Sequence, residues 1–131
     1  MKKLIFILAL ISLICVGCKN ETATEIITVI SPQEVYDAVY NNEKVQLIDV
    51  RTQDEFSEGH ISSSQNVCVT DDDFKEKAAK LNKDQPVYVY CKSGGRSARA
   101  AKILKDMGFK EIYDMQGGIT NWESKGLPQN N

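Results

Sequence analysis

Residues 86–97 of the 131-residue chain read PVYVYCKSGGRS. The first five lack polar alternation, which is typical of a strand at the centre of a parallel sheet. Cys91 follows that strand directly, and Gly94 and Gly95 lead into a run of helix-forming residues that stops at Gly108. Because ligands of open α/β folds bind at the carboxyl ends of the strands, this segment predicts a functional site at that sheet edge.

On either side of this segment, short apolar runs alternate with amphipathic segments. We expect strands at residues 26–30, 45–50, 66–69, 86–90 and 111–115, and helices after Ser31, after Thr52 and at residues 71–81, 97–107 and 119–124. Ser31 and Thr52 are each followed three residues later by a glutamate, which is the pattern of a capping box. The alternation predicts an α/β domain with a central parallel sheet and helices on both faces.

Composition excludes several classes of protein. Hydrophobic residues make up 42% and charged residues 26%, and the length allows one globular domain. The formal charge is −2 and the basic residues form no stripe, so we expect no nucleic-acid partner. Four cysteines and a single histidine, His60, match neither a disulfide framework nor a zinc site, and we expect no bound metal.

The N-terminal segment carries the pattern of an export signal. Two lysines precede a mostly apolar run at residues 4–16, which is shorter than the roughly 20 residues that span a bilayer. The following junction, with Gly17 before Cys18, resembles the lipobox of bacterial lipoproteins, in which the cysteine is lipidated and becomes the new N-terminus. An ordinary signal peptide, or an uncleaved anchor with an incidental cysteine, is the alternative.

This pattern divides the chain into four parts. We expect a lipoprotein signal peptide at residues 1–17, lipidated Cys18 with a polar tether to residue 25, a domain at 26–128 and a tail at 129–131. The lipid would attach an exported protein to a membrane of the bacterial cell envelope, at the periplasmic face or the cell surface.

The loop after the central strand suits a reactive cysteine. Gly94 and Gly95 allow the backbone to curl so that successive N–H groups point at the Cys91 sulfur. The N-terminus of the following helix adds partial positive charge, and Lys92 and Arg96 add two full charges. Each of these favours the thiolate, which is the nucleophilic form, and the same cradle would hold a small anion.

Three separated motifs resemble the rhodanese family of sulfurtransferases. Residues 47–51 (LIDVR) and 55–61 (EFSEGHI) match the family pattern D-V-R…E-[FY]-x-x-G-H-I. Residues 91–97 (CKSGGRS) match the active loop C-x-x-G-x-R-[SA], and residues 117–122 (GGITNW) match the closing motif G-G-[IW]-x-x-W. The resemblance covers nearly all of residues 26–128 and implies a rhodanese-like fold.

The resemblance also implies a two-step reaction. Cys91 would take the outer sulfur of an anionic donor such as thiosulfate, become a persulfide and pass that sulfur to a thiol or to cyanide, without a cofactor. Lys92 and Arg96 would orient the anion, and the loop backbone would stabilise the persulfide. The substrate-binding residues are thus Lys92, Ser93, Gly94, Gly95 and Arg96. We expect this protein to act as a monomer.

Other residues in the motifs are interpreted as structural support. The resemblance implies that Asp49 and Arg51 form a polar pair beneath the loops of the sheet edge, and that His60 fixes a turn rather than acting as the base. Cys68 has two interpretations: a small apolar residue at a strand end, or a resolving thiol able to form a disulfide with Cys91.

Two rival functions are considered. Dual-specificity phosphatases of the same fold use C-x5-R, since a tetrahedral phosphate needs a wider ring of N–H groups, whereas Cys91 and Arg96 are separated as C-x4-R. The second rival is a non-enzymatic persulfide carrier or sulfur sensor. It would keep Cys91 but turn over thiosulfate poorly.

Overall fold

The computed structural model describes residues 24–42 and 44–130. The predicted signal peptide and Cys18 lie outside these residues. Within them, no helix is both long enough and apolar enough to cross a membrane.

Five strands and five helices alternate along this part of the chain. The strands are β1 (Ile27–Ile30), β2 (Gln46–Asp49), β3 (Gln65–Asn66), β4 (Val87–Tyr90) and β5 (Ile112–Met115). The helices are α1 (Pro32–Asn41), α2 (Gln53–Glu58), α3 (Phe74–Ala78), α4 (Gly95–Asp106) and α5 (Gly118–Ser124). The strands form one sheet in the order β1-β5-β4-β2-β3, and all its pairs are parallel. The predicted central position of β4 is confirmed.

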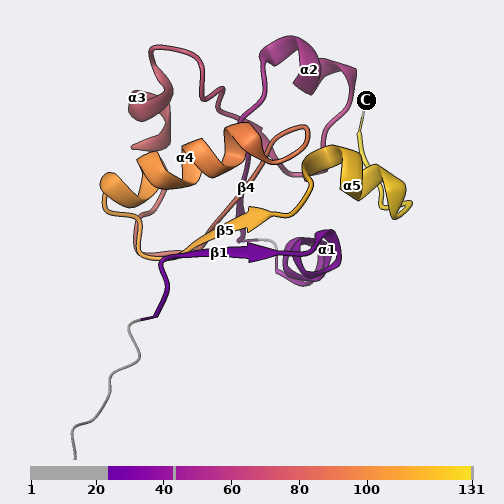
Figure 1. The fold of residues 1–131 in the computed structure, drawn as a ribbon, viewed down its shortest axis with the longest axis horizontal. Coiled ribbons are helices and arrows are strands. Elements are labelled where there is room, and N and C mark those ends of the chain that lie inside the picture. The colour runs from indigo at the N-terminus through magenta and orange to yellow at the C-terminus, as the bar shows by residue number, and fades with distance from the viewer. Residues whose placement is uncertain (1–23, 43, 131) are drawn as a thin grey trace, which may run out of the picture.

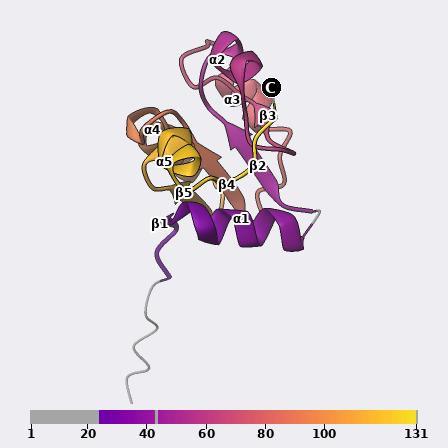
Figure 2. The same cartoon turned by 90° about the vertical axis from the view of Figure 1, so that its right-hand side faces the viewer.

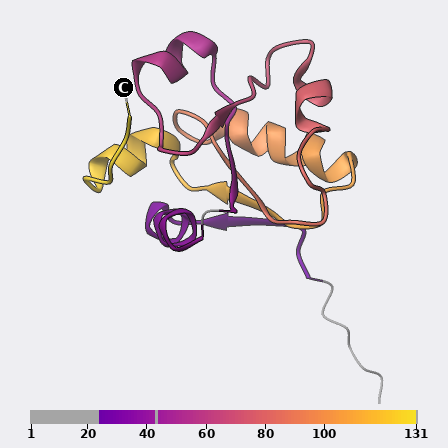
Figure 3. The same cartoon turned by 180° about the vertical axis from the view of Figure 1, so that it is seen from behind.

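Two apolar clusters hold helices on opposite faces of the sheet. On one face, Leu104 and other residues of α3 and α4 pack on strand residues such as Ile48. On the other, Trp122 of α5 and residues of α1 pack on strand residues such as Leu47. Leu47 and Ile48 are adjacent, and they face opposite sides because side chains alternate along a strand. Figure 1 shows α3 and α4 together on one side of the strands and α1 on the other, and Figure 3 shows the same layers from behind. The expected α/β architecture is confirmed.

Both predicted capping boxes form. In α1, the Ser31 hydroxyl accepts from the Glu34 N–H, and the Glu34 carboxylate accepts from the Ser31 N–H at 2.8 Å. In α2, Thr52 and Glu55 make the same reciprocal pair. Each box satisfies N–H groups that the first helical turn leaves without partners.

Two elements are shorter than the sequence predicts. We expected a strand at 66–69, but regular pairing ends at Asn66. Beyond it, the N–H of Val67 still donates to the Asp49 carbonyl, and the N–H of Val69 donates to the Val50 carbonyl. We expected a helix at 71–81, but α3 is a short segment flanked by i→i+3 turns. The acidic residues therefore lie in the turn before α3, while buried Phe74 holds the segment on the sheet.

The C-terminal segment returns to the sheet edge. Asn130 pairs with His60 through two backbone hydrogen bonds of 2.8 and 2.7 Å, although the sequence placed the end of the domain at residue 128. Figure 2 shows the C-terminal end beside α2 and β3. The last described residues thus help to hold the loop after α2.

Candidate active site

Cys91 lies at the carboxyl end of the central strand β4 and is 1% exposed. Its Sγ accepts the N–H of Gly94 at 3.0 Å and lies 3.4 Å from the Ser97 hydroxyl oxygen. Gly94 has φ +121°, a conformation that favours glycine, and it places this N–H toward the sulfur. Helix α4 begins at Gly95, earlier than the predicted residue 97, so its first turn closes over the sulfur.

The environment of the sulfur favours the thiolate. Burial raises the pKa of the Cys91 thiol, but hydrogen bonds from Ser97 and from the N–H groups of Gly94 and Ser93 outweigh burial, so the pKa is lowered overall. A buried sulfur normally stays a thiol, because low polarity disfavours charge. The loop reverses that preference with neutral donors that belong largely to its backbone.

The start of α5 holds the loop from the side opposite the sulfur. The Ile119 N–H donates to the Cys91 carbonyl at 2.8 Å, and the Thr120 N–H donates to the Lys92 carbonyl at 3.1 Å. Gly118 makes this approach achievable, because a Cβ at that position would lie 2.4 Å from the Lys92 carbonyl. The motif at residues 117–122 therefore serves the active loop directly.

Arg96 is already paired in this structure. Its guanidinium makes two hydrogen bonds to the Glu55 carboxylate, at 2.7 and 2.9 Å, and both side chains are about one-third exposed. Hydrogen bonding to Glu55 raises the pKa of Arg96, and the same bonds lower the pKa of Glu55 to about 2. We predicted from the sequence that Arg96 orients an anion, but in this structure its charge is paired with the Glu55 carboxylate of α2.

The remaining predicted loop residues form the rim of the site. Lys92, Ser93 and Gly95 are exposed. Lys92 borders a pocket between α2 and α5 that is also lined by Glu58 and Glu123. A ligand that enters this pocket therefore meets charges of both signs beside the loop.

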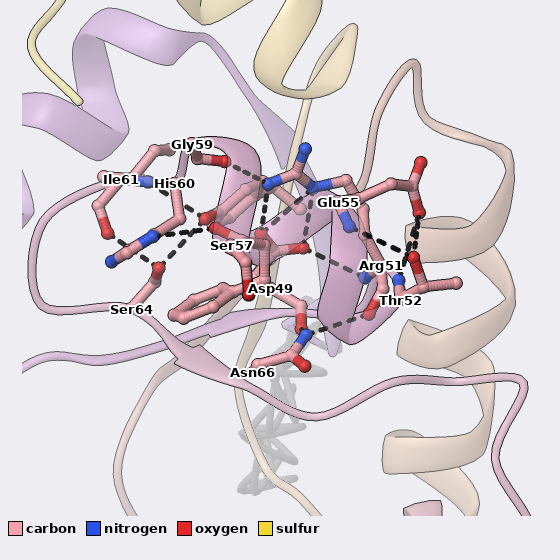
Figure 4. A network of polar contacts seen from close by, with 12 residues as sticks. Asp49, Arg51, Thr52, Glu55, Ser57, Gly59, His60, Ile61, Ser64 and Asn66 are labelled. Carbon is pink, nitrogen blue, oxygen red and sulfur yellow. Dashed lines mark hydrogen bonds and ion pairs between the residues drawn. The ribbon is translucent and has the colours of Figure 1, made fainter. Parts of the chain in front are cut away.

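The predicted polar pair of Asp49 and Arg51 is buried at the end of β2 (Figure 4). The Arg51 guanidinium donates to the Asp49 carboxylate and, through the same nitrogen, to the Gly59 carbonyl, each at 2.6 Å. Burial lowers the pKa of Arg51, but Asp49 more than compensates and raises it. The Asn66 amide donates to the Asp49 and Arg51 carbonyls, which ties β3 to the same network.

His60 holds the turn after α2. Its Nδ1 lies 3.0 Å from the Phe56 carbonyl, which can only accept, so this nitrogen carries the proton. Its ring stacks on Phe56 with centroids 3.8 Å apart. Next to it, the Ile61 N–H donates to the Tyr90 hydroxyl of β4 at 3.1 Å. These contacts position α2, and hence Glu55, beside the active loop.

Cys68 is a buried free thiol beyond β3, and its sulfur lies 3.1 Å from the Thr70 hydroxyl. Cys91 is also free. Among the described residues, no group of three or more His, Cys, Asp or Glu side chains is placed to bind a metal ion.

Three residues of this site had no functional role predicted from the sequence, although each lies within one of the three motifs that resemble the rhodanese family. Glu55 was interpreted as a helix cap, and it also binds Arg96. Ser97 contacts the sulfur, and Gly118 admits the active-loop backbone. A signal was available for Ser97, which lies in the first turn of the helix after the cysteine. No pattern in the sequence indicated that Glu55 of α2 would contact Arg96 of α4.

Comparison with known proteins identifies the family of this chain. A family model described as the rhodanese-like domain matches residues 31–125. The chain is 40% identical over 93 residues to YqhL, an uncharacterized protein of Bacillus subtilis, with 71% of each protein covered. It is 35% identical over 95 residues to the thiosulfate sulfurtransferase GlpE of Coxiella burnetii, covering 72% of this chain and 86% of GlpE. The polysulfide-sulfur transferase of Wolinella succinogenes matches with a TM-score of 0.68 and 32% identity, covering 83% of this chain and 82% of that one. The chain therefore belongs to the rhodanese-like domain family, which includes sulfurtransferases.

Proposed function

We propose that this protein is a sulfurtransferase that moves a sulfane sulfur from an anionic donor such as thiosulfate to a thiol or to cyanide. The observation that carries the proposal is the Cys91 sulfur, which is buried, accepts the Gly94 N–H at 3.0 Å and has a lowered thiol pKa. The similarity to sulfurtransferases over most of the domain supports the same reaction class.

The first step forms a persulfide. The Cys91 thiolate attacks the outer sulfur of thiosulfate, a new S–S bond forms, and the original S–S bond breaks with its electron pair leaving on sulfite. In the second step the acceptor attacks the outer sulfur of the persulfide, and the Cys91 thiolate leaves. No net oxidation or cofactor is required. The N–H donors that stabilise the thiolate before the first step also receive it as the leaving group of the second.

Charged side chains guide the donor to the loop. Lys92 is exposed at the rim and attracts an anion toward the sulfur. Arg96 contributes once the donor competes with Glu55 for its guanidinium, so Glu55 sets how strongly an anionic donor binds. The described contacts of the site all come from this chain, and we propose that the enzyme acts as a monomer.

A steady-state assay tests the proposed activity. Purified protein is given thiosulfate and cyanide, and sulfite and thiocyanate are measured together. We expect equal amounts of both and parallel double-reciprocal plots at fixed cyanide concentrations, the pattern of a ping-pong reaction. A persulfide on Cys91 without turnover would instead favour a sulfur carrier, and no reaction with any sulfane donor would overturn the proposal.

We also propose that the protein is lipid-anchored in a bacterial cell envelope. Residues 1–17 would be removed as a signal peptide and Cys18 would carry the lipid, with residues 19–25 as a tether to the domain. Growth with an alkyne-tagged fatty acid tests this. We expect labelling that Cys18→Ala abolishes and Cys15→Ala retains; labelling that survives Cys18→Ala would contradict it.

A further inference from the structure

Asp114 is a buried carboxyl group that the proposed reaction does not use. It lies on β5 and is 6% exposed. Its Oδ1 is fully enclosed and has no hydrogen-bond partner among the described residues. Because an ionised carboxylate without partners is costly to bury, this position favours a neutral carboxylic acid.

Asp114 lies on the same side of the sheet as the reactive sulfur. It is in parallel register with Val89 of β4, two residues before Cys91. Val89 and Cys91 both belong to the apolar cluster beneath α3 and α4, so alternation places Asp114 under α4 as well. Figure 1 shows α4 extending over β4 and β5. The first turn of α4 therefore covers both groups.

Ser97, in that first turn, connects the two groups. It is fully buried, and its hydroxyl oxygen lies 3.4 Å from the Cys91 sulfur and 3.2 Å from the Gly94 carbonyl. Burial raises the pKa of Asp114, and the nearby Ser97 hydroxyl lowers it without offsetting that rise. The Ser97 hydroxyl has one proton, so the groups around it compete for that proton.

We propose that Asp114 is a positioning residue that acts in its neutral form, by directing its carboxyl O–H to the Ser97 oxygen and so leaving the Ser97 proton for the Cys91 thiolate. This role deepens the proposed sulfur-transfer function and rests on it. In the thiol state, the Cys91 S–H donates to the Ser97 hydroxyl oxygen, and the Ser97 O–H donates to the Gly94 carbonyl. When Cys91 ionises, the Ser97 hydroxyl turns to the sulfur while Asp114 still donates to its oxygen.

An ionised Asp114 would have the opposite effect. It would accept the Ser97 proton itself and place a second negative charge near the sulfur. In the sheet, Asp114 is in register with two apolar residues, Val89 of β4 and Val29 of β1, and Ser97 of α4 is the side chain that contributes to its pKa. Arg96 of α4 is engaged by Glu55. Cys91 belongs to the apolar cluster on the same face of the sheet, and its sulfur lies 3.4 Å from the Ser97 hydroxyl oxygen.

The test measures the thiolate pKa of Cys91 from the pH dependence of its alkylation by iodoacetamide, with peptide mass spectrometry separating Cys91 from Cys68. The proteins compared are wild type, Asp114→Asn, Asp114→Ala, Ser97→Ala and the double alanine variant. We expect Asp114→Asn to match wild type, since its amide N–H also donates to Ser97. Asp114→Ala should slow alkylation at neutral pH on the order of fivefold, the size of one hydrogen bond.

The proposal requires that this effect act through Ser97. In the Ser97→Ala background, Asp114→Ala should have no further effect on the thiolate pKa. Additive effects of the two substitutions, or an Asp114→Asn variant as slow as Asp114→Ala, would overturn it. Alkylation needs no sulfur donor, so this outcome is separate from failure of the sulfur-transfer assay.

A second measurement applies even where the alanine variants do not fold. Carbon-13 labelling of the aspartate carboxyls, assigned with Asp114→Asn, reports the charge of Asp114 in the wild-type chain. We expect a protonated carboxyl at the neutral pH at which Cys91 reacts. An ionised Asp114 at that pH would overturn the proposal.

Discussion

The connections that follow β2 and β4 lie at the same edge of the sheet and lead into helices, yet they satisfy their polar groups differently. After β2, charged side chains bind one another and nearby carbonyls: Asp49 and Arg51 form a buried pair that also reaches Gly59. After β4, backbone N–H groups and one hydroxyl converge on the Cys91 sulfur.

This difference indicates that the connection after β2 supports the structure, whereas the connection after β4 provides the reactive site. The opposite charges of Asp49 and Arg51 are paired with each other. That connection therefore serves to fix the structure, and little of its charge is available to a ligand. The donors after β4 are neutral and point to one atom, so in the proposed reaction they favour negative charge there before and after each transfer of sulfur. Glu55 and Arg96 join the two connections and are the place where the scaffold acts on the site.

The largest effect is expected from Cys91→Ser. Sulfur transfer should be abolished, because serine keeps the shape of the site but cannot form a persulfide, while the thermal unfolding temperature should stay within a few degrees. The control is Cys68→Ser, which also exchanges a buried sulfur for oxygen. We expect it to retain most activity; loss of turnover with cyanide in this variant would establish a catalytic role for Cys68.

Breaking the scaffold should mainly affect stability. Arg51→Met leaves Asp49 as a buried charge without its partner, which costs about 3–5 kcal/mol of unfolding free energy. Lys110→Met is a matched control, since Lys110 forms an ion pair with Asp84 at an exposed position, where such a pair contributes about 1 kcal/mol or less. Urea unfolding compares the two, and equal losses would contradict the assignment of Arg51 as scaffold.

The contact behind the active loop is tested by Gly118→Ala. The new Cβ would meet the Lys92 carbonyl at 2.4 Å, and φ is +61°, so we expect a loss of about 2–3 kcal/mol together with reduced activity. Gly126→Ala has a similar φ of +67° but no atom within 4 Å of the added Cβ. It should cost less stability and keep activity; similar losses in both would mean that backbone strain alone is responsible.

The smallest effect on stability is expected from Glu55→Gln. The pair is partly exposed, so its loss should cost about 1 kcal/mol or less. The pKa of Glu55 is lowered to about 2, chiefly by hydrogen bonding to Arg96. The stabilisation is therefore complete above the ordinary value of 4.5 and is lost as the pH falls toward 2, and pH-dependent melting of both proteins measures it.

The same variant should sharpen donor specificity. Releasing Arg96 gives an anionic donor a free guanidinium, so KM for thiosulfate should fall several-fold while kcat for an uncharged dialkyl trisulfide donor changes little. Glu123→Gln removes a charge from the same pocket without freeing Arg96 and serves as the control. An unchanged KM for thiosulfate in Glu55→Gln would show that Arg96 does not contact the donor.

The sequence predicted the parts of the molecule that local rules determine. The central strand, both capping boxes and the cysteine loop follow from patterns within about ten residues, and the structure contains the strand and boxes as expected. The lengths of β3 and α3 were misjudged: regular strand pairing ends at Asn66, and turns rather than further helix flank α3.

Contacts between distant segments required the structure. Glu55 precedes Arg96 by 41 positions, and nothing in either motif states that the helix cap also neutralises the loop arginine. Asp114 likewise appears in the sequence as one polar residue in a short strand. Its burial under α4 depends on strand order, which its own segment does not specify.

The central claim is that sulfur passes through Cys91. Purified protein is incubated with thiosulfate in the absence of an acceptor, and the intact mass, the modified peptide and the released sulfite are measured. We predict the addition of one sulfur atom on Cys91, one sulfite per protein molecule, and loss of the added sulfur when cyanide is supplied. Sulfite release in Cys91→Ser, or sulfur located on Cys68 instead, would contradict the account.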